Sequence, residues 1–285
     1  MAVYTGFNEA TALECKGQSL LADLEECEKN GFDYIEIRFD SVRDYLKDHT
    51  LDDLAQWFAA HNLKPWAYNT LIFFNQRNEA GVKEIDDEVD FIIEVSEAIG
   101  MKTLVTVPSF DVVKEDGNPY SIEEFRDEAV TRLQYLADKV APHGLRISLE
   151  FCGAPGCSIN QFGTAYEVVK AVSRDNVGIT LDCFHFHGMD SHWEDLENAD
   201  AKKIFILHLN DVENLPIGQL ADIHRVWPGE GVLELERTFK ILKDKGFEGV
   251  CTIEEFRPEY YELSHAENVK TAYEYTKAIV DKYFG

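Results

Sequence analysis

The sequence predicts an α/β protein built as a single (β/α)8 TIM barrel over residues 1–285. Three observations lead to this prediction. Short apolar runs rich in β-branched residues alternate with longer amphipathic stretches along the whole chain. Eight such runs occur, each followed by a helix pattern or by a loop that contains one. Several of the amphipathic stretches end in glycine, which is a common helix terminus.

The individual elements follow one another in a regular order. Parallel strands covered by helices should be almost continuously apolar, and "KTLVTV" and "KIFILHL" have this character. An open doubly wound sheet is the alternative fold, but no G-x-G-x-x-G or P-loop glycine motif follows an early strand. We expect strands at residues 2–7, 32–38, 63–69, 101–109, 145–151, 176–182, 201–211 and 249–256, and helices at 19–31, 51–62, 82–100, 121–144, 162–174 and 264–284.

Composition narrows the classes of partner. The formal net charge is −26, with 27 basic and 53 acidic residues, so the chain lacks the basic surface that a phosphate backbone requires. We therefore expect no nucleic acid partner. We also expect no membrane span, because no apolar run reaches about 18 residues. Without a secretory signal, and with six scattered cysteines that fit reduced thiols, the protein is expected to be cytoplasmic.

Four consecutive strand candidates end in side chains that can bind a metal. These are Glu150, Asp182, His208 and either Glu254 or Glu255. Their spacing is close to one βα unit of about 30 residues, so a barrel would bring them together at the carboxyl ends of adjacent strands, where barrel active sites lie. Taken singly, each is as well explained as a helix cap or a rim residue. Together they favour a shared site.

Three carboxylates and an imidazole suit a divalent ion such as Mn²⁺, Co²⁺ or Zn²⁺ with open coordination positions, and the absence of thiolates argues against a structural zinc site. Strand alternation makes Glu254, rather than Glu255, the inward residue, because Thr252 shares its face. His185, three residues after Asp182, is expected to contact either the metal-bound substrate or the surroundings of the metal. His187 is expected to be structural.

Segments spread over nearly the full chain resemble the xylose isomerase-like TIM barrels, and among them the inosose isomerases. They are "FNEAT", "DYIEIR", "YLKDHTLDDLA", "SRDNVG", "LDCFHFH", "KKIFILHLND", "RVWPGEG" and "FRPEYY". The resemblance implies substrate contacts from His185 and Arg225, although a longer segment separates His208 from Arg225 here than in related ketose epimerases. It also implies that one divalent metal is bound by Glu150, Asp182, His208 and Glu254.

The activity implied by the resemblance is a step of inositol catabolism. The carbonyl of an inosose would move from 2-keto-myo-inositol to 1-keto-D-chiro-inositol through an enediolate, with Glu150 and Glu254 as base and acid. We expect a small polyol or keto-inositol substrate and no nucleotide cofactor; a homo-oligomer is left open. The alternatives on the same metal site are a ketohexose 3-epimerase, an inosose dehydratase and a hydroxypyruvate isomerase. A non-enzymatic sugar-binding protein is a further alternative, and the acidic charge disfavours an endonuclease.

Other residues at strand ends are weaker candidates for lining the pocket. For each of them, hydrogen bonding at the rim or ordinary packing is at least as good an interpretation. The polar candidates are Asn8, Glu9, Glu36, Arg38 and Asn69, and the aromatic candidates for an apolar wall are Trp66, Phe73, Phe74 and Trp227.

Overall fold

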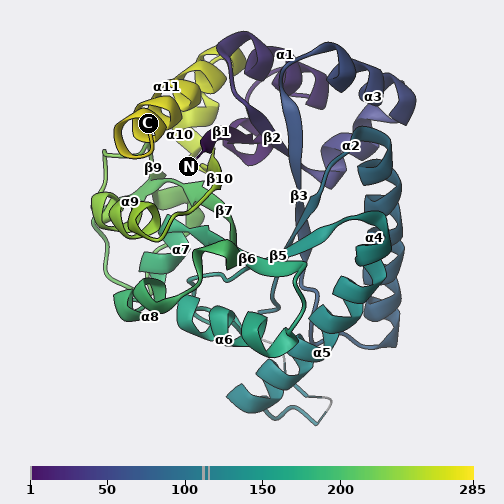
Figure 1. Cartoon of the computed structure of the whole chain (residues 1–285), viewed down its shortest axis with the longest axis vertical. Helices are drawn as coiled ribbons and strands as arrows, with labels where there is room; N and C mark the ends of the chain where they lie inside the picture. The colour runs from purple at the N-terminus through teal and green to yellow at the C-terminus, as the bar shows by residue number, and fades with distance from the viewer. Residues whose placement is uncertain (1, 111–112, 115) are drawn as a thin grey trace.

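A closed parallel barrel forms the centre of the structure, a computed structural model that describes residues 2–110, 113–114 and 116–285 (Figure 1). Its eight strands are hydrogen-bonded in the order β1-β10-β7-β6-β5-β4-β3-β2. This confirms the predicted (β/α)8 fold. The barrel strands are β1 (Val3–Asn8), β2 (Tyr34–Ile37), β3 (Lys64–Ile72), β4 (Thr103–Val107), β5 (Arg146–Glu150), β6 (Val177–Asp182), β7 (Ile204–Leu209) and β10 (Gly249–Ile253).

Helices surround the barrel on its outside (Figure 1). Many begin at a side chain that caps free backbone N–H groups: Ser19 accepts from Ala22 N, and Ser264 forms a reciprocal capping box with Glu267. The helices are α1 (Leu20–Asn30), α2 (Phe39–Tyr45), α3 (Leu51–Ala60), α4 (Glu79–Ile99), α5 (Ile122–Val140), α6 (Phe162–Val172), α7 (Cys183–Gly188), α8 (Trp193–Asn198), α9 (Leu235–Asp244), α10 (Pro258–Tyr261) and α11 (His265–Tyr283), with 3₁₀ turns η1 (Glu9–Ala12), η2 (Ala141–His143), η3 (Ala201–Lys203) and η4 (Asp222–His224).

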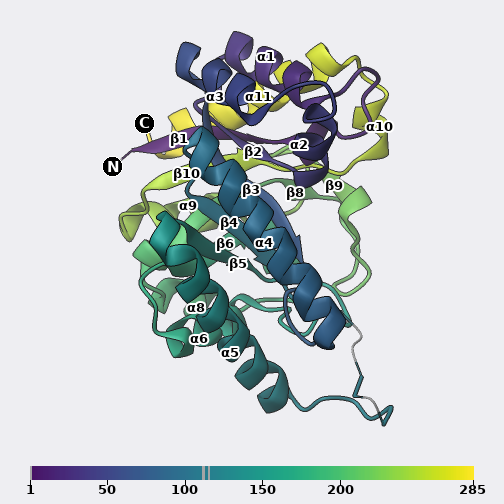
Figure 2. The same ribbon diagram turned by 90° about the vertical axis from the view of Figure 1, so that its right-hand side faces the viewer.

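The structure adds elements that the sequence prediction lacked. Helices α2, α7, α8, α9 and α10 lie outside the residue ranges expected for helices, and the expected strand at 201–211 begins with the turn η3. A small antiparallel sheet, made of β8 (Asp211–Val212) and β9 (Arg225–Val226), lies outside the barrel order. Figure 2 shows this sheet on the side of the barrel away from the two chain termini. These added elements sit largely on the connections that follow β6 and β7.

The inside of the barrel changes character along its axis. At the amino-terminal ends of the strands, the Trp66 ring packs beside Tyr34, with ring centroids 4.9 Å apart. The Arg146 guanidinium lies over both Trp66 and Phe205, at 4.9 and 4.4 Å from their ring centroids. These aromatic rings and the arginine fill the amino-terminal end of the barrel and form what we call the aromatic floor. The polar side chains lie at the opposite, carboxyl-terminal end.

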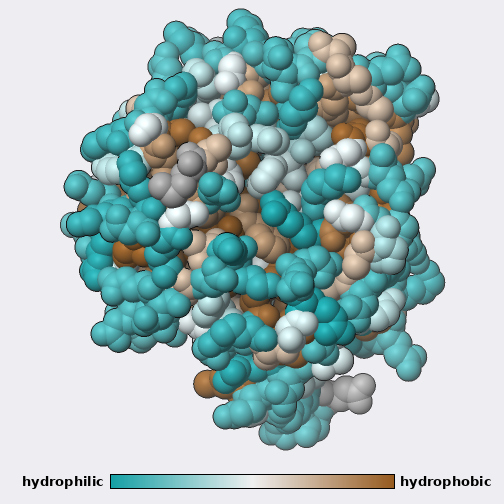
Figure 3. Space-filling view, in the orientation of Figure 1, coloured by the Kyte–Doolittle hydropathy of each residue, from teal (hydrophilic) through white to brown (hydrophobic). Residues whose placement is uncertain are grey.

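The outer surface on the face shown in Figure 3 is mostly hydrophilic, with hydrophobic residues in small scattered patches. A hydrophilic surface is consistent with a chain in which 28% of the residues are charged. Among the described residues, no helix combines the length and the apolar character that crossing a bilayer would require.

A buried acidic cluster ties the ends of β1, α1 and α11 together. Asp23 of α1 accepts from Gln18 Nε2 at 2.7 Å, and its other oxygen lies 2.6 Å from His265 Nε2. Glu9 is fully buried nearby and accepts from the Arg38 backbone N–H at 2.6 Å. Burial, reinforced by repulsion from Asp23, raises the pKa of Glu9 well above its ordinary value.

We predict that Glu9→Gln removes a pH dependence of stability. Because the folded protein holds the Glu9 proton to a higher pH than the unfolded chain, the wild-type free energy of unfolding falls as pH rises above 4.5. The fall is at most about 1.4 kcal/mol per pH unit and ends at the folded pKa. Glutamine stays uncharged, so the variant should gain stability relative to wild type over this range. Urea unfolding at several pH values measures the difference.

Glu28→Gln is a control of opposite sign. Burial opposes the effect, but hydrogen bonds from the backbone N–H groups of Leu63 and Asn62 lower the pKa of Glu28. Its contribution to stability is therefore present above the ordinary pKa and lost at lower pH, so this variant should be weakened toward neutral pH. A difference between Glu9→Gln and wild type that does not change with pH would contradict the prediction.

Candidate metal centre

Four neighbouring barrel strands deliver side chains to one point at their carboxyl ends. Glu150 ends β5, Asp182 ends β6, His208 lies in β7, and Glu254 directly follows β10. His208 is in register with Asp182 on one side and with Thr252 on the other, so the side chains share the inner face. One ligand-capable atom of each of the four residues lies within 4.8 Å of the others. The structure thus brings together the residues that the sequence singled out.

These side chains are buried, which makes their mutual repulsion costly and their partners important. His208 Nδ1 lies 2.8 Å from Glu150 Oε1, 3.3 Å from Glu254 Oε2 and 3.7 Å from Asp182 Oδ2. Burial alone would lower the pKa of His208, but the neighbouring carboxylates, first Glu254 and then Glu150, raise it well above its ordinary value. The imidazole is therefore electrostatically coupled to the whole acidic group.

Arg225 supplies a second positive charge to the centre. Its side chain is only 1% exposed, and its Nη1 lies 2.8 Å from Asp182 Oδ2 and 3.2 Å from Glu254 Oε2. Burial works against ionisation of Asp182, but Arg225 and the histidines lower the pKa of this carboxyl. Arg225 is therefore buried against the carboxylates and does not lie on the surface of the molecule. Whether Arg225 also contacts substrate stays a prediction.

The small sheet of β8 and β9 holds Arg225 in place. Asp211, in β8, accepts from the Leu233 N–H at 2.8 Å and from the Gly229 N–H at 3.0 Å, which folds the "PGEG" segment back onto the sheet. A Cβ atom on Gly231 would lie 2.3 Å from Asp211 Oδ1, so only glycine fits this close approach. Asp222 also accepts from Arg225 Nη2 at 2.9 Å and fixes the plane of the guanidinium.

His185 lies beside Arg225, in the first turn of α7. Its backbone N–H donates to Asp182 Oδ1 at 2.9 Å, so Asp182 is the N-cap of this helix. His185 Nε2 lies 3.5 Å from Arg225 Nη2, while its Nδ1 is buried without a hydrogen-bond partner among the described residues. His187 points elsewhere and lines a separate pocket beside α9. His185 therefore lies in the surroundings of the metal-binding candidates, and its contact with substrate stays a prediction.

Sequence reasoning missed Asn210 and gave little weight to Asn8. Asn210 donates to Asp182 Oδ2 at 3.0 Å and accepts from the Phe184 N–H at 2.8 Å. Asn8 donates to Glu254 Oε1 at 2.8 Å. Each asparagine thus orients one carboxylate of the centre. The available signal was position alone, since both follow directly on apolar strand residues near the carboxyl end of a strand.

One of the four aromatic wall candidates, Trp66, lies away from the centre. Trp66 belongs to the aromatic floor at the amino-terminal end of the barrel, because it stands near the start of β3 rather than near its end. Phe74 is fully buried in the main core. Phe73 is partly exposed, and its ring centroid lies 5.9 Å from that of Phe110. Trp227 stacks on Tyr260 with ring centroids 4.2 Å apart. The wall hypothesis is wrong for Trp66 and stays a prediction for Phe73, Phe74 and Trp227.

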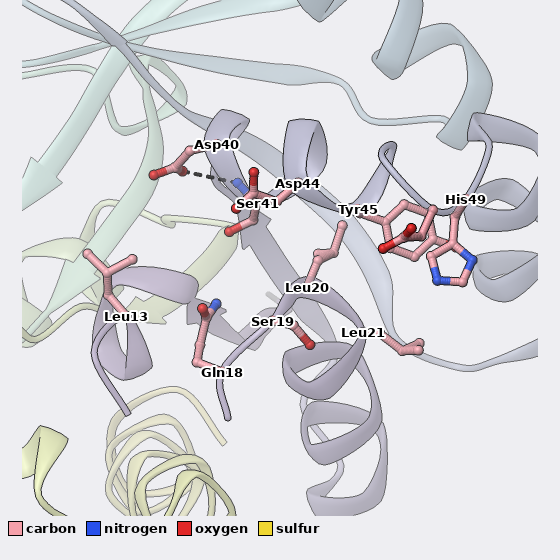
Figure 4. A pocket seen from close by; sticks show the side chains of 11 residues that line it. Leu13, Gln18, Ser19, Leu20, Leu21, Asp40, Ser41, Asp44, Tyr45 and His49 are labelled. Carbon is pink, nitrogen blue, oxygen red and sulfur yellow. Dashed lines mark hydrogen bonds between the residues drawn. The ribbon is translucent and has the colours of Figure 1, made fainter. Parts of the chain in front are cut away.

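A distinct pocket of about 370 Å³ lies between the start of α1 and α2 (Figure 4). Two of its carboxylates form ion pairs with basic side chains. Asp44 Oδ1 lies 2.6 Å from Lys47 Nζ, and Asp40 Oδ1 lies 3.2 Å from Arg38 Nε. None of the four converging residues takes part in this pocket. Its lining residues are Leu13, Gln18, Ser19, Leu20, Leu21, Asp40, Ser41, Asp44, Tyr45, Asp48 and His49.

The donor set at the barrel end fits a divalent cation. Three carboxylates and one imidazole form a mixed oxygen and nitrogen environment, which suits ions such as Mn²⁺, Co²⁺ or Zn²⁺ better than Ca²⁺. No thiolate belongs to the set, which argues against a closed structural zinc site. A (β/α)8 barrel with such a centre at the carboxyl ends of its strands is the class of protein that fold and site define.

Comparison with known proteins specifies the family. Residues 24–279 match the family model described as xylose isomerase-like TIM barrel, and the chain belongs to this family. It is 49% identical over 279 residues to an inosose isomerase of Halalkalibacterium halodurans, covering 98% of this chain and 96% of that protein. It is 48% identical over 282 residues to an inosose isomerase of Bacillus subtilis, covering 98% of both chains.

A solved structure supports the same assignment. The crystal structure of the IolI protein with a bound zinc atom aligns with a TM-score of 0.95 at 48% identity, covering 99% of this chain and 100% of that chain. The bound zinc of that protein and the buried donor set of this chain together support a divalent metal site.

Loss of the Asn210 side chain should destabilise the centre even without metal. In Asn210→Leu, Asp182 loses a donor and the buried Phe184 N–H loses its acceptor. We expect the free energy of unfolding of the metal-free protein to fall by about 1–3 kcal/mol in urea titrations. Asn118→Leu, at an exposed position, should change it by less than about 0.5 kcal/mol. Equal stability of wild type and Asn210→Leu would show that these bonds contribute nothing.

Proposed function

We propose that this protein is a divalent-metal-dependent inosose isomerase that interconverts 2-keto-myo-inositol and 1-keto-D-chiro-inositol. The observation that carries the proposal is the 48–49% identity, over 98% of this chain, to relatives named inosose isomerase. The centre supplies the chemistry that such a reaction needs. The whole chain, residues 1–285, would act as one catalytic domain. Its six cysteines are free and buried, which fits a cytoplasmic enzyme.

The reaction moves a carbonyl between neighbouring carbons without net oxidation. A proton leaves the hydroxyl-bearing carbon beside the ketone, an enediolate forms, and a proton returns to the former carbonyl carbon. The hydroxyl proton also leaves its oxygen, and the former carbonyl oxygen gains one, so that ketone and hydroxyl exchange places. One carbon is oxidised while its neighbour is reduced, so no external oxidant or reductant is required. The main barrier is the negative charge that develops on oxygen, and the protein must therefore provide both proton transfer and stabilisation of this charge.

Glu150 and Glu254 are the proposed base and acid. Glu150 ends β5 and Glu254 follows β10, and these are the two outer strands of the four-strand arc that carries the centre. A ring bound over the arc would therefore have one carboxyl group toward each side. Burial and the nearby charge of Glu254 raise the pKa of Glu150, while His208 opposes this shift. A divalent cation held by the same carboxylate would keep Glu150 ionised, so its strength as a base would come from its position and its partial desolvation.

His185 and Arg225 are proposed to hold substrate oxygens. The buried Nδ1 of His185 has no hydrogen-bond partner among the described residues and can bind a hydroxyl group. The Arg225 guanidinium lies 4.6 Å from the Phe184 ring centroid and 5.2 Å from the Phe256 ring centroid. These rings confine the guanidinium and exclude water around it, which strengthens its interaction with a developing negative charge.

The metal would be held by Glu150, Asp182, His208 and Glu254. When bound, a divalent cation acts as a Lewis acid that stabilises negative charge on a substrate oxygen, without proton transfer. We propose Mn²⁺, Co²⁺ or Zn²⁺ for this role. The partner is a small keto-polyol, and no motif for a nucleotide cofactor accompanies the site.

The acid-base assignment predicts the behaviour of two variants. Glu150→Gln and Glu254→Gln should each lower turnover by about 100-fold or more, because glutamine cannot take up or release the transferred proton. Product formation and loss of the substrate α-hydrogen in D₂O can be followed by NMR. One variant can retain exchange while losing turnover, which would identify its residue as the acid of the second step. Wild-type exchange and turnover in both variants would rule the assignment out.

Removal of metal should abolish the isomerisation. After treatment with a chelator, activity should fall to background and return on addition of Mn²⁺, Co²⁺ or Zn²⁺, and elemental analysis of untreated protein should identify the native ion. Asp182→Asn should not be restored in the same way. Full activity of demonstrably metal-free protein would refute the metal requirement. Ketohexoses and hydroxypyruvate, assayed in parallel, should turn over more slowly than the inososes; a faster reaction would point to one of the alternative activities.

A further inference from the structure

Glu36 faces His208 across the inside of the barrel. It lies in β2, which is separated from β7 by β1 and β10 in the barrel order, so the contact is not between neighbouring strands. Glu36 Oε2 lies 3.2 Å from His208 Nε2, and both side chains are fully buried. Neither the four-strand arc nor the proposed acid-base pair requires this glutamate.

The two ring nitrogens of His208 face different groups. Nδ1 is directed toward Glu150 Oε1, at 2.8 Å, and the rest of the acidic group, whereas Nε2 is directed toward Glu36. A neutral imidazole carries one N–H and one lone pair, and only the nitrogen with the lone pair can bind a metal. For Nδ1 to be the ligand atom, the hydrogen must therefore be on Nε2, where a buried N–H needs an acceptor.

We propose that Glu36 is a positioning residue of the metal centre: it accepts the Nε2–H of His208 and so presents the Nδ1 lone pair to a divalent cation. The inference rests on the metal dependence in the proposed function but not on the substrate or the reaction. Metal-binding histidines generally donate their second N–H to a carboxylate, a carbonyl or water, and this partner fixes both the tautomer and the orientation of the ring.

Glu36 is itself held from a neighbouring strand. Asn69 Nδ2 donates to the same oxygen, Oε2, at 3.2 Å, so this oxygen lies between the asparagine amide and the imidazole. Glu36 is also in register with Asn8 of β1, which donates to Glu254 of the centre. Strands β1, β2 and β3 therefore orient the side chains that β7 and β10 contribute.

Metal affinity provides the first test, using the purified full chain and no substrate. Glu36→Gln keeps the shape of the side chain but weakens the acceptor, and it should reduce the affinity for Zn²⁺ and Co²⁺ by about 10–100-fold in competition with a chromophoric chelator. Glu36→Leu removes the acceptor and should reduce it at least as much. Glu9→Gln is the matched control, since Glu9 is equally buried but is not bonded to His208; its affinity should stay within about twofold of wild type.

The tautomer of His208 provides a readout that a merely structural role would not move. In ¹⁵N-labelled, zinc-loaded wild type, the His208 ring should carry its hydrogen on Nε2 and the metal on Nδ1. In Glu36→Leu, the Nε2 hydrogen should exchange with water faster. If Glu36→Leu does not fold, Glu36→Gln still decides the affinity.

Two results would overturn the proposal. One is wild-type zinc affinity in folded Glu36→Gln, and the other is a hydrogen on Nδ1 with the metal on Nε2. Either result leaves the isomerase proposal intact if the wild type is metal-dependent and turns over inosose. Conversely, a wild type that binds zinc through Nδ1 but does not turn over inosose would refute the isomerase and leave the role of Glu36 standing.

Discussion

The site depends on holding like charges together away from water. Glu150, Asp182 and Glu254 are buried with ligand atoms within 4.8 Å of one another and of His208. Carboxylates in such an environment lose hydration and repel one another strongly, so they require positive charge and hydrogen-bond donors close by. His208 and Arg225 provide the charge, and the amides of asparagines provide donors. The rest of the carboxyl end of the barrel is arranged to keep these partners in position.

This constraint explains features that lie outside the barrel strands. Arg225 reaches the centre from β9, which has no partner in the barrel and is held by β8 instead. Asp211 and Gly231 make the turn that follows compact enough to pack against this small sheet. The long connection between β7 and β10 thus positions the Arg225 guanidinium against the carboxylates of Asp182 and Glu254.

Most of the fold could be predicted from the sequence. Local apolar runs mark the strands, and a parallel barrel arranges such strands in a regular order. It also distinguished Glu254 from Glu255, because alternation along a strand is a local rule. Trp66 was misplaced because β3 extends to Ile72, beyond the predicted end at residue 69, which puts the indole near the start of the strand. The meeting of Glu36 and His208 could not be predicted, since it depends on barrel closure between strands that are not neighbours. Asn210 was missed because an asparagine after a strand usually only caps a turn.

The junction of β6 and α7 has a consequence for how such a protein can diversify. Asp182 is the last residue of the strand and the N-cap of the helix, and the same carboxylate accepts from the His185 backbone. No linker residue separates the two elements, so His185 cannot shift without moving Asp182. An inserted residue here would uncouple the two side chains, whereas the connection after β7 can change in length at lower cost. A change of ligand would therefore arise more readily through the connection after β7 than through the junction of β6 and α7.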